Sequence, residues 1–244
     1  MIRVGTIGTS QITERFLEAL SLLPEVYELQ GVYSRHKNKA KDLAQRFGAT
    51  YYCDDLAEFW ADPELDLVYI ASPNGAHFEQ TKRAIQAGKH VIVEKPAVSS
   101  PEEWRELVKL AAEHQVYIFE AARNYHEVAF TVIRDFLKDK KIWGANFTYA
   151  KYSSKMGALL SGQEPNVFSA KFSGGALMDL GVYTLYAAVR LFGAPQSVCY
   201  TAQQLPNSVD LNGSGSLIYP DFQVRIQAGK NIHSQLPAEI YTDQ

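Results

Sequence analysis

The sequence predicts an α/β fold, with a doubly wound parallel sheet in the first half and an α+β half that carries a largely antiparallel open sheet. Two hydrophobic periodicities alternate over the first 120 residues, which is the pattern of βαβ units. Two runs within this stretch, VYIAS and HVIVE, are almost wholly apolar, as expected of strands that are buried on both faces. After residue 140 the chain reads as strands, one helix and further strands.

The elements of the first half follow from composition and from turn residues. Short β-rich runs predict strands at residues 2–7, 27–33, 67–71, 90–93 and 116–120. Amphipathic stretches between them predict helices at residues 11–23, 38–47, 75–87 and 101–113. Ser100 and Pro101 give the last helix an N-cap and a proline at its first position, and Gly88 ends the helix before it.

The second half is more irregular, and the domain boundary is placed between residues 122 and 123. Strands are expected at residues 143–153, 197–205, 214–220 and 222–228, and one helix at residues 175–192. Residues 155–173 read as a long irregular loop, of a kind that is often functional. The last residues, AEIYTDQ, stop within a strand, so the second sheet is expected to lack its last strands.

Composition excludes several classes of protein. The 244 residues are 46% hydrophobic and 21% charged, which is typical of a globular protein, and the net charge of −3 with no basic stripe argues against nucleic acid as a partner. Cys53 and Cys199 are too few for a disulfide framework, which indicates a reducing compartment. The N-terminus lacks the pattern of a signal peptide, and no apolar run approaches the ~20 residues of a membrane span. A cytoplasmic protein with no membrane partner is predicted.

The turn after the first strand carries a partial phosphate-binding motif. Gly8 takes the place of the first glycine of G-x-G-x-x-G, whereas Ser10 and Thr13 stand at the second and third. The residues expected to contact a dinucleotide pyrophosphate at the N-terminus of the following helix are Gly8, Thr9, Ser10, Gln11 and Ile12. The alternative is an ordinary strand-to-helix turn.

The end of the second strand bears on which dinucleotide would bind. A site specific for NAD usually has an acidic residue here for the ribose 2′-hydroxyl, and none is present. Ser34 and Arg35 could instead hold a 2′-phosphate, with Lys37 nearby. NADP is therefore the expected cofactor and NAD the alternative, unless these residues are only the solvated basic start of a helix.

Three further segments carry a family resemblance: ASPNGAH at residues 71–77, GKHVIVEKP at 88–96 and GGALMDLGVY at 174–183. With the N-terminal turn, they make the chain resemble the Gfo/Idh/MocA (glucose-fructose oxidoreductase, inositol dehydrogenase and rhizopine-catabolism) family, from residue 1 to roughly residue 230. The resemblance implies a Rossmann domain, an α/β domain with a large open sheet, and an NAD(P)-dependent oxidoreductase acting on sugars, cyclitols and related alcohols. The family often has His where Tyr183 stands, and Tyr is found in members resembling glucose-fructose oxidoreductase and dihydrodiol dehydrogenase.

The positions of these segments also have a physical meaning. Ligands of open parallel sheets bind beyond the carboxyl ends of the strands. The residues that follow two of the predicted strands, and so are expected at a cofactor, are Ser72, Pro73, Asn74, Glu94 and Lys95. His77 faces the cofactor or caps its helix, and Arg123 is placed near the nicotinamide by the resemblance. The alternative for Lys95 is a surface cation paired with Glu94.

The predicted catalytic residues are Lys95, Asp179 and Tyr183. Asp179 and Tyr183 are four residues apart at the start of a helix and so share a face. Tyr183 would take or give the proton of a substrate hydroxyl, Lys95 as a cation would favour the tyrosinate, and Asp179 would orient Tyr183 or the substrate. No metal site is predicted. Alternatives are a non-catalytic NADP-binding sensor or a chain inactive for want of its last strands, and an apolar outer sheet face would favour a homodimer or homotetramer.

Overall fold

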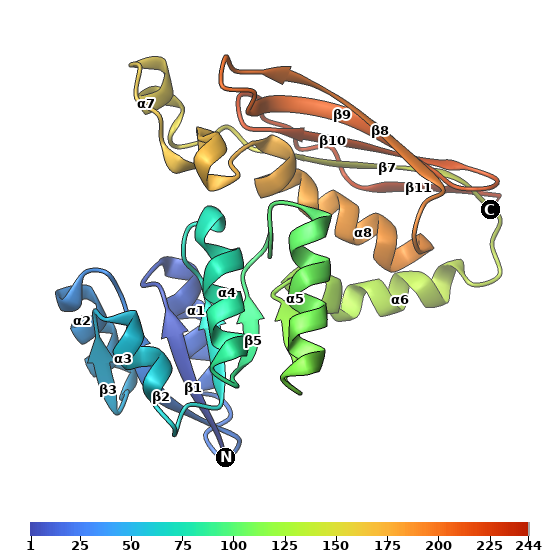
Figure 1. Cartoon of the computed structure of the whole chain (residues 1–244). Helices are drawn as coiled ribbons and strands as arrows, with labels where there is room; N and C mark the ends of the chain where they lie inside the picture. The colour runs from blue at the N-terminus through green and yellow to red at the C-terminus, as the bar shows by residue number, and fades with distance from the viewer. Residues whose placement is uncertain (244) are drawn as a thin grey trace. The chain divides into compact units, whose positions relative to one another are not determined.

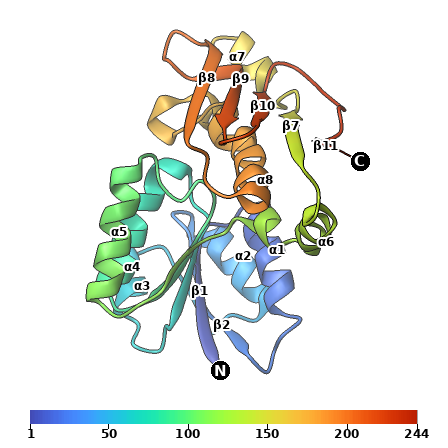
Figure 2. The ribbon, with the colours of Figure 1, turned by 90° about the vertical axis from the view of Figure 1, so that its right-hand side faces the viewer.

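The computed structural model describes residues 1–243 and divides into two compact units, Met1–Ala121 and Ala122–Gln244 (Figures 1 and 2). The first unit is a six-stranded parallel sheet in the order β3-β2-β1-β4-β5-β6. This is the strand order of a Rossmann fold. Its strands are β1 (Ile2–Ile7), β2 (Tyr27–Tyr33), β3 (Tyr51–Cys53), β4 (Leu67–Ile70), β5 (His90–Val93) and β6 (Ile118–Glu120).

Helices cover both faces of this sheet (Figure 2). They are α1 (Gln11–Leu20), α2 (Lys37–Phe47), α3 (Leu56–Ala61), α4 (His77–Gln86) and α5 (Pro101–Glu113), with a 3₁₀ turn at Asn74–Ala76. One core cluster joins α1 and α2 to β2 through Leu17, Val32 and Leu43, and the other is centred on buried residues such as Phe59 and Leu107. Burial on both faces explains why the strands read as continuous apolar runs.

The sequence missed two elements of the first unit, β3 and α3. They have three and six residues, which is too short for a hydrophobic period to be recognised. The N-cap of α3 is nevertheless clear in the structure, because the Asp55 side chain accepts a hydrogen bond from the Ala57 N–H at 2.7 Å.

The second unit is a five-stranded sheet in the order β11-β7-β10-β9-β8. Three of its strand pairs are antiparallel, and β10 pairs with β7 in parallel, so the sheet is largely antiparallel as predicted. The strands are β7 (Ile142–Ala150), β8 (Ser197–Gln204), β9 (Asp210–Ile218), β10 (Gln223–Gly229) and β11 (Glu239–Thr242). The final strand-like residues of the chain thus form β11, which lies at an edge beside β7.

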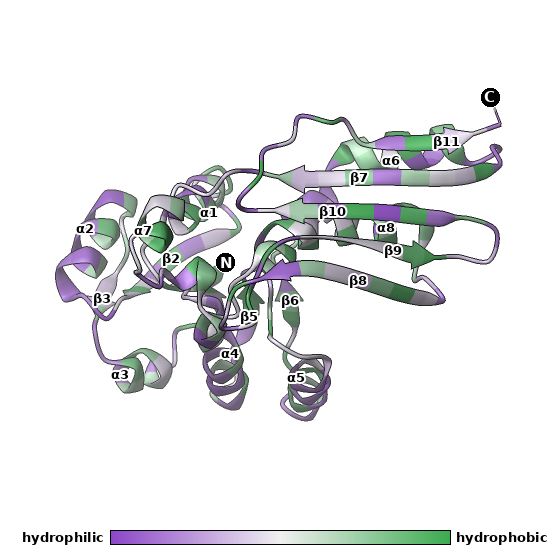
Figure 3. Cartoon of the chain, turned by 90° about the horizontal axis from the view of Figure 1, so that it is seen from above, coloured by the Kyte–Doolittle hydropathy of each residue, from purple (hydrophilic) through white to green (hydrophobic). Residues whose placement is uncertain are grey.

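Helices pack on one face of this sheet, with α6 (Val128–Leu137) and α8 (Val182–Phe192) behind the strands in Figure 3. The sequence missed α6 because VAFTVIRDFL is rich in apolar and β-branched residues, which obscure a helical period. A 3₁₀ turn at Arg123–His126 precedes α6. The expected loop at residues 155–173 contains a short helix, α7 (Met156–Leu160), and 3₁₀ turns at Asn166–Phe168 and Ala170–Phe172.

The expected helix at residues 175–192 is two structures in series. A π-helical turn, Leu177–Gly181, precedes α8. Contrary to the expectation from composition, residues 170–192 are long and apolar enough to pass as a membrane span, a test that core helices of globular proteins also pass. Here α8 packs Ala188, which is fully buried, and Leu185 into a core with the sheet residues Phe147 and Val224.

Candidate functional site

The carboxyl ends of β1 and β4 are in close contact at Gly8. Its φ of +111° lies in the region that favours glycine, and a Cβ there would be 2.5 Å from the carbonyl oxygen of Ala71. The Gly8 N–H donates to the Tyr33 carbonyl at 3.2 Å. Glycine is therefore required at this first position of the motif.

The first turn of α1 is open to an anion. Ser10 is the N-cap, in extended conformation, and its side chain makes no capping hydrogen bond. Its hydroxyl lies 3.5 Å from that of Thr13, which is fully buried and stands at the third glycine position. The uncapped N–H groups and the dipole of a ten-residue helix suit a phosphate group. Gly8, Thr9, Ser10, Gln11 and Ile12 all lie at this turn.

After β2, the two candidate basic residues, Arg35 and Lys37, have different surroundings. The Arg35 side chain is exposed, and no ion pair to it is found among residues 1–243. Lys37 instead lies 3.4 Å from the Asp54 carboxylate. Ser34 is 7% exposed, and its hydroxyl accepts a hydrogen bond from the His36 N–H at 3.3 Å. Arg35 is thus the residue of this group best placed to bind an added phosphate.

His77 joins the segments that follow β4 and β5. The ring is fully buried, with Nε2 2.9 Å from the Ser72 carbonyl oxygen and Nδ1 2.9 Å from that of Pro96. Both ring nitrogens therefore face backbone carbonyls, and the ring ties the segment after β4 to the segment after β5. Ser72 is held further because its hydroxyl donates to Gln80 Oε1 at 2.6 Å. Pro73 and Asn74 follow at the start of the 3₁₀ turn.

Glu94 and Lys95 directly follow β5, and Glu94 has partners that the sequence did not indicate. Its Oε1 accepts a hydrogen bond from the Tyr69 hydroxyl at 2.6 Å, and its Oε2 accepts from the backbone N–H of Lys95 at 3.2 Å. Burial, reinforced by the Glu94 carboxylate, raises the pKa of Tyr69, so its hydroxyl stays a donor. Glu94 therefore fixes the backbone at Lys95.

In the second unit, Asp179 lies in the π-helical turn and forms an ion pair. Its Oδ2 is 2.5 Å from Nζ of Lys230, a lysine just after β10. The start of the turn is held by Asp210, whose Oδ2 accepts hydrogen bonds from the Leu177 N–H and the Tyr200 hydroxyl, both at 2.8 Å. Gly175, at a φ of +129°, lies so close to Asp210 that a Cβ would overlap its carboxylate.

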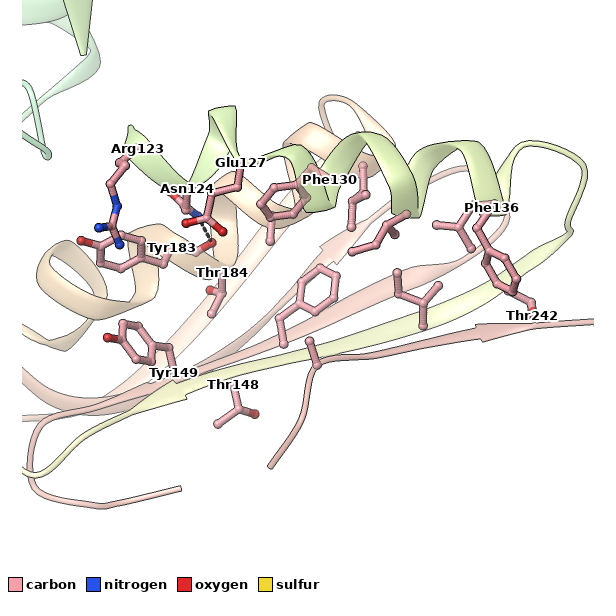
Figure 4. A pocket seen from close by; sticks show the side chains of 17 residues that line it. Arg123, Asn124, Glu127, Phe130, Phe136, Thr148, Tyr149, Tyr183, Thr184 and Thr242 are labelled. Carbon is pink, nitrogen blue, oxygen red and sulfur yellow. Dashed lines mark hydrogen bonds between the residues drawn. The ribbon is translucent and has the colours of Figure 1, made fainter. Parts of the chain in front are cut away.

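Tyr183 lies in the first turn of α8 and lines a cavity of about 750 Å³ (Figure 4). Its ring meets that of Tyr149 edge-on, with the centroids 5.5 Å apart, and its backbone carbonyl accepts a hydrogen bond from Asn124 at 3.4 Å. Arg123 lies at the same end of the cavity (Figure 4). The cavity has a polar end and an apolar remainder, the latter including Phe130, Ile133, Phe147, Leu191 and Ile240.

The structure gathers the predicted residues into two groups. One group lies at the strand ends of the first unit, and Asp179, Tyr183 and Arg123 belong to the second. Sequence reasoning missed Lys230 and Asp210, although a Gly-Lys pair after an alternating strand was a signal for the lysine. Among residues 1–243, no group of three or more His, Cys, Asp or Glu side chains could hold a metal ion.

Comparison with known proteins places the chain in a family. Residues 2–122 match the NAD-binding Rossmann domain of the GFO/IDH/MocA oxidoreductases, and residues 141–244 match the C-terminal domain of the same family. The chain belongs to the Gfo/Idh/MocA family. The predicted family, fold class and NAD(P)-dependent oxidoreductase activity on CH–OH groups are thereby confirmed.

Several relatives are similar over nearly the whole chain. The uncharacterized oxidoreductase YgjR of Escherichia coli is 39% identical, and the NADP-dependent scyllo-inositol 2-dehydrogenase IolU of Bacillus subtilis is 38% identical. Each alignment covers 98% of this chain and 73% of the relative. Levoglucosan dehydrogenase, solved with NADH and levoglucosan, has the same fold, with a TM-score of 0.86 and 22% identity over 99% of this chain and 71% of that one.

A 3-ketoreductase, KijD10 of Actinomadura kijaniata, also shares the fold. It was solved with NADP and TDP-benzene, and it has a TM-score of 0.84 and 23% identity over 99% of this chain and 84% of that one.

Proposed function

We propose that this oxidoreductase transfers hydride between the nicotinamide of NADP(H) and a CH–OH or carbonyl group of a cyclitol, sugar or related polyol. The observation that carries the proposal is that Tyr183, a side chain able to transfer a proton, lines a cavity in a chain with an NAD-binding Rossmann unit. Residues 1–122 would bind the cofactor, and residues 123–244 would bind the substrate.

The cofactor residues are assigned from the geometry of the first unit. The open first turn of α1, from Gly8 to Ile12, would hold the pyrophosphate, and Arg35 with Ser34 the 2′-phosphate. The nicotinamide end of the cofactor would be lined by Ser72, Pro73, Asn74 and Glu94. The family resemblance implies that Arg123 also lies near the nicotinamide. The close contact at Gly8, the uncapped helix α1 and Arg35, which has no ion pair within residues 1–243, all fit a dinucleotide with a 2′-phosphate.

The chemistry divides between cofactor and protein. When bound, nicotinamide accepts or donates the hydride. Tyr183 would take the hydroxyl proton during alcohol oxidation and return it during carbonyl reduction. Lys95 would favour the tyrosinate by its positive charge, and Asp179 would orient the substrate hydroxyl.

The substrate class is supported by the relatives. IolU is named as a scyllo-inositol dehydrogenase that uses NADP, and a 26% identical protein of Xenopus laevis is named as a trans-1,2-dihydrobenzene-1,2-diol dehydrogenase. Both of these substrates carry adjacent hydroxyl groups on a six-membered ring. A cyclic polyol is therefore the class to test first.

The proposal also includes a cytoplasmic location, without membrane or nucleic-acid partner, and assembly as a homodimer or homotetramer. The state of the cysteines bears on the location: both are free thiols, and burial raises the pKa of Cys53 to about 11. The exposed aromatic side chains Trp143 and Tyr241 line a hollow of about 350 Å³ on the sheet of the second unit, and they are the apolar residues there that a second copy would cover. Light scattering after size exclusion would measure the assembly, and a monomer would contradict this part.

The experiment that tests the function is a substrate screen. Cyclitols, sugars and vicinal diols are incubated with NADP⁺ or NAD⁺, and nicotinamide absorbance is followed. We expect turnover with at least one cyclic polyol and a higher kcat/KM with NADP⁺. Tight NADPH binding without any turnover would instead indicate the non-catalytic sensor.

A further inference from the structure

We propose that Lys230 is a positioning residue of the active site, which fixes the Asp179 carboxylate through a buried ion pair. This inference rests on the proposed function, because it assigns a role to a group that acts on Asp179. Lys230 directly follows β10, in the second unit.

Lys230 stands at a core position of its strand. Side chains alternate between the faces of a strand, and the inward residues of β10 are Val224, Ile226 and Ala228, all at most 5% exposed. Lys230 continues this alternation and is 3% exposed. A lysine is almost never buried to this extent unless it is paired.

The surroundings of Lys230 fix its whole length. Its backbone N–H donates to the Leu211 carbonyl at 2.7 Å, and its carbonyl accepts from the Ser153 N–H at 2.8 Å. Its ammonium lies 2.5 Å from Asp179 Oδ2 and 5.8 Å from the centre of the buried Phe168 ring. Leu211 and Ser153 thus hold the backbone of Lys230, while Asp179 and Phe168 lie around its ammonium.

The two partners differ in exposure. The Lys230 side chain is 4% exposed, whereas that of Asp179 is 34% exposed. The lysine thus binds the carboxylate from inside the protein, and the carboxylate remains accessible to a substrate. A buried ion pair gives little net stability over apolar side chains of the same size, because both charges lose hydration. A role in fixing the carboxylate accounts for a charge at this core position.

The π-helical turn directs Asp179 towards the lysine. The turn packs against β10 so closely that a Cβ on Gly181 would be 3.1 Å from Cβ of Ala228. Single π-helical turns are frequent at functional sites. Asp179 is therefore held by the turn from one side and by Lys230 from the other, four residues before Tyr183.

The test compares Lys230→Met, Lys230→Arg, Asp179→Asn and the double variant Asp179→Asn/Lys230→Met. We expect Lys230→Met to lower kcat for the polyol at least about tenfold, with the KM for NADP⁺ unchanged, because only the carboxylate is displaced. Lys230→Arg should recover most of this loss. The double variant should be no slower than Asp179→Asn alone, since the two residues act as a unit.

The matched control is Lys151→Met, an exposed lysine whose N–H donates to the Gly229 carbonyl beside Lys230. It should keep the wild-type kcat. Wild-type kcat in a folded Lys230→Met, or a further loss when Lys230→Met is added to Asp179→Asn, would overturn the proposal. If Lys230→Met does not fold, kcat is compared between the double variant, in which both charges are removed, and Asp179→Asn. Equal kcat values support the proposal, and a lower kcat in the double variant overturns it.

A binding measurement separates a failure of the proposed function from a failure of the role proposed for Lys230. If the wild type turns over no polyol, calorimetric titration of scyllo-inositol into the NADP⁺-loaded proteins replaces kcat. Weaker binding in Lys230→Met, with no further weakening on the Asp179→Asn background, supports the role of Lys230. Unchanged binding, including no detectable binding by any of the proteins, overturns it.

Discussion

The two units hold their candidate functional residues by different means. In the first unit, these residues follow successive parallel strands, so sheet topology alone brings them to one edge. In the second unit, Asp179 is bound by Lys230, which lies 51 residues away in the sequence. The turn that carries Asp179 is bound at Leu177 by Asp210, which lies 33 residues from Leu177. A parallel sheet therefore places a site by its order of strands, whereas the mixed sheet does so by individual long-range contacts.

The largest expected effect combines one residue from each unit. Lys95→Ala and Tyr183→Phe should each lower kcat by ~10²–10⁴-fold, because each removes a group that moves or stabilises the transferred proton. Cofactor affinity, measured by quenching of protein fluorescence, should change little. The double variant should lose little more than the worse single variant.

Two exposed residues serve as controls for this pair. Lys109→Ala on α5 and Tyr152→Phe after β7 remove the same chemical groups outside the proposed site. Both should keep wild-type kcat. A wild-type kcat in either Lys95→Ala or Tyr183→Phe would contradict the proposed role of that residue.

The next effect tests the long-range contacts of the second unit. Gly175→Ala should lower the free energy of unfolding by about 2–3 kcal/mol, because the residue has a positive φ and its Cβ would overlap Asp210. Gly157→Ala in α7, where a Cβ would meet nothing within 4 Å, is the matched control. Urea unfolding followed by circular dichroism measures both, and equal midpoints would contradict the expectation.

The next prediction concerns the first unit and tests whether Arg35 determines the preference for NADPH over NADH. Arg35→Ala should weaken NADPH binding by about 1.5–3 kcal/mol and leave NADH binding nearly unchanged, because only the 2′-phosphate loses a charged partner. Lys37→Ala, whose ammonium already pairs with Asp54, should have a much smaller effect. Fluorescence titration with both dinucleotides decides, and equal weakening of the two would remove Arg35 from the 2′-phosphate site.

The smallest expected effect is a pH dependence within the first unit. The Arg3 guanidinium, which donates to both carboxylate oxygens of Asp66 at 3.1 Å, lowers the pKa of that carboxyl. The pair therefore stabilises the fold above the unfolded pKa, near ~4, and this contribution is lost as the pH falls through the lower folded value. Asp66→Asn should lower the unfolding midpoint slightly at pH 7 and not at pH 2, and a drop of the same size at both values would contradict this origin.

How far the sequence predicted the structure also divides between the units. The bounds of β1, β2, β5 and α5 were predicted to the residue, because buried parallel strands and capped helices leave strong local signals. In the second unit, α6 was missed, and the helix expected at residues 175–192 was a π-helical turn followed by α8. The Asp179–Lys230 pair depends on how β10 passes the turn, and residue spacing does not contain that information.

The parallel pairing of β7 with β10 has a consequence for how the chain folds. β7 enters the sheet first in sequence, but its two neighbours, β10 and β11, are the last strands of the unit. The strands β8, β9 and β10 can pair successively through short connections, whereas β7 can pair with β10 only by closing a loop that contains α8. We therefore expect the pairings of β7 with β10 and β11, which close the longest loops of this sheet, to complete the sheet late.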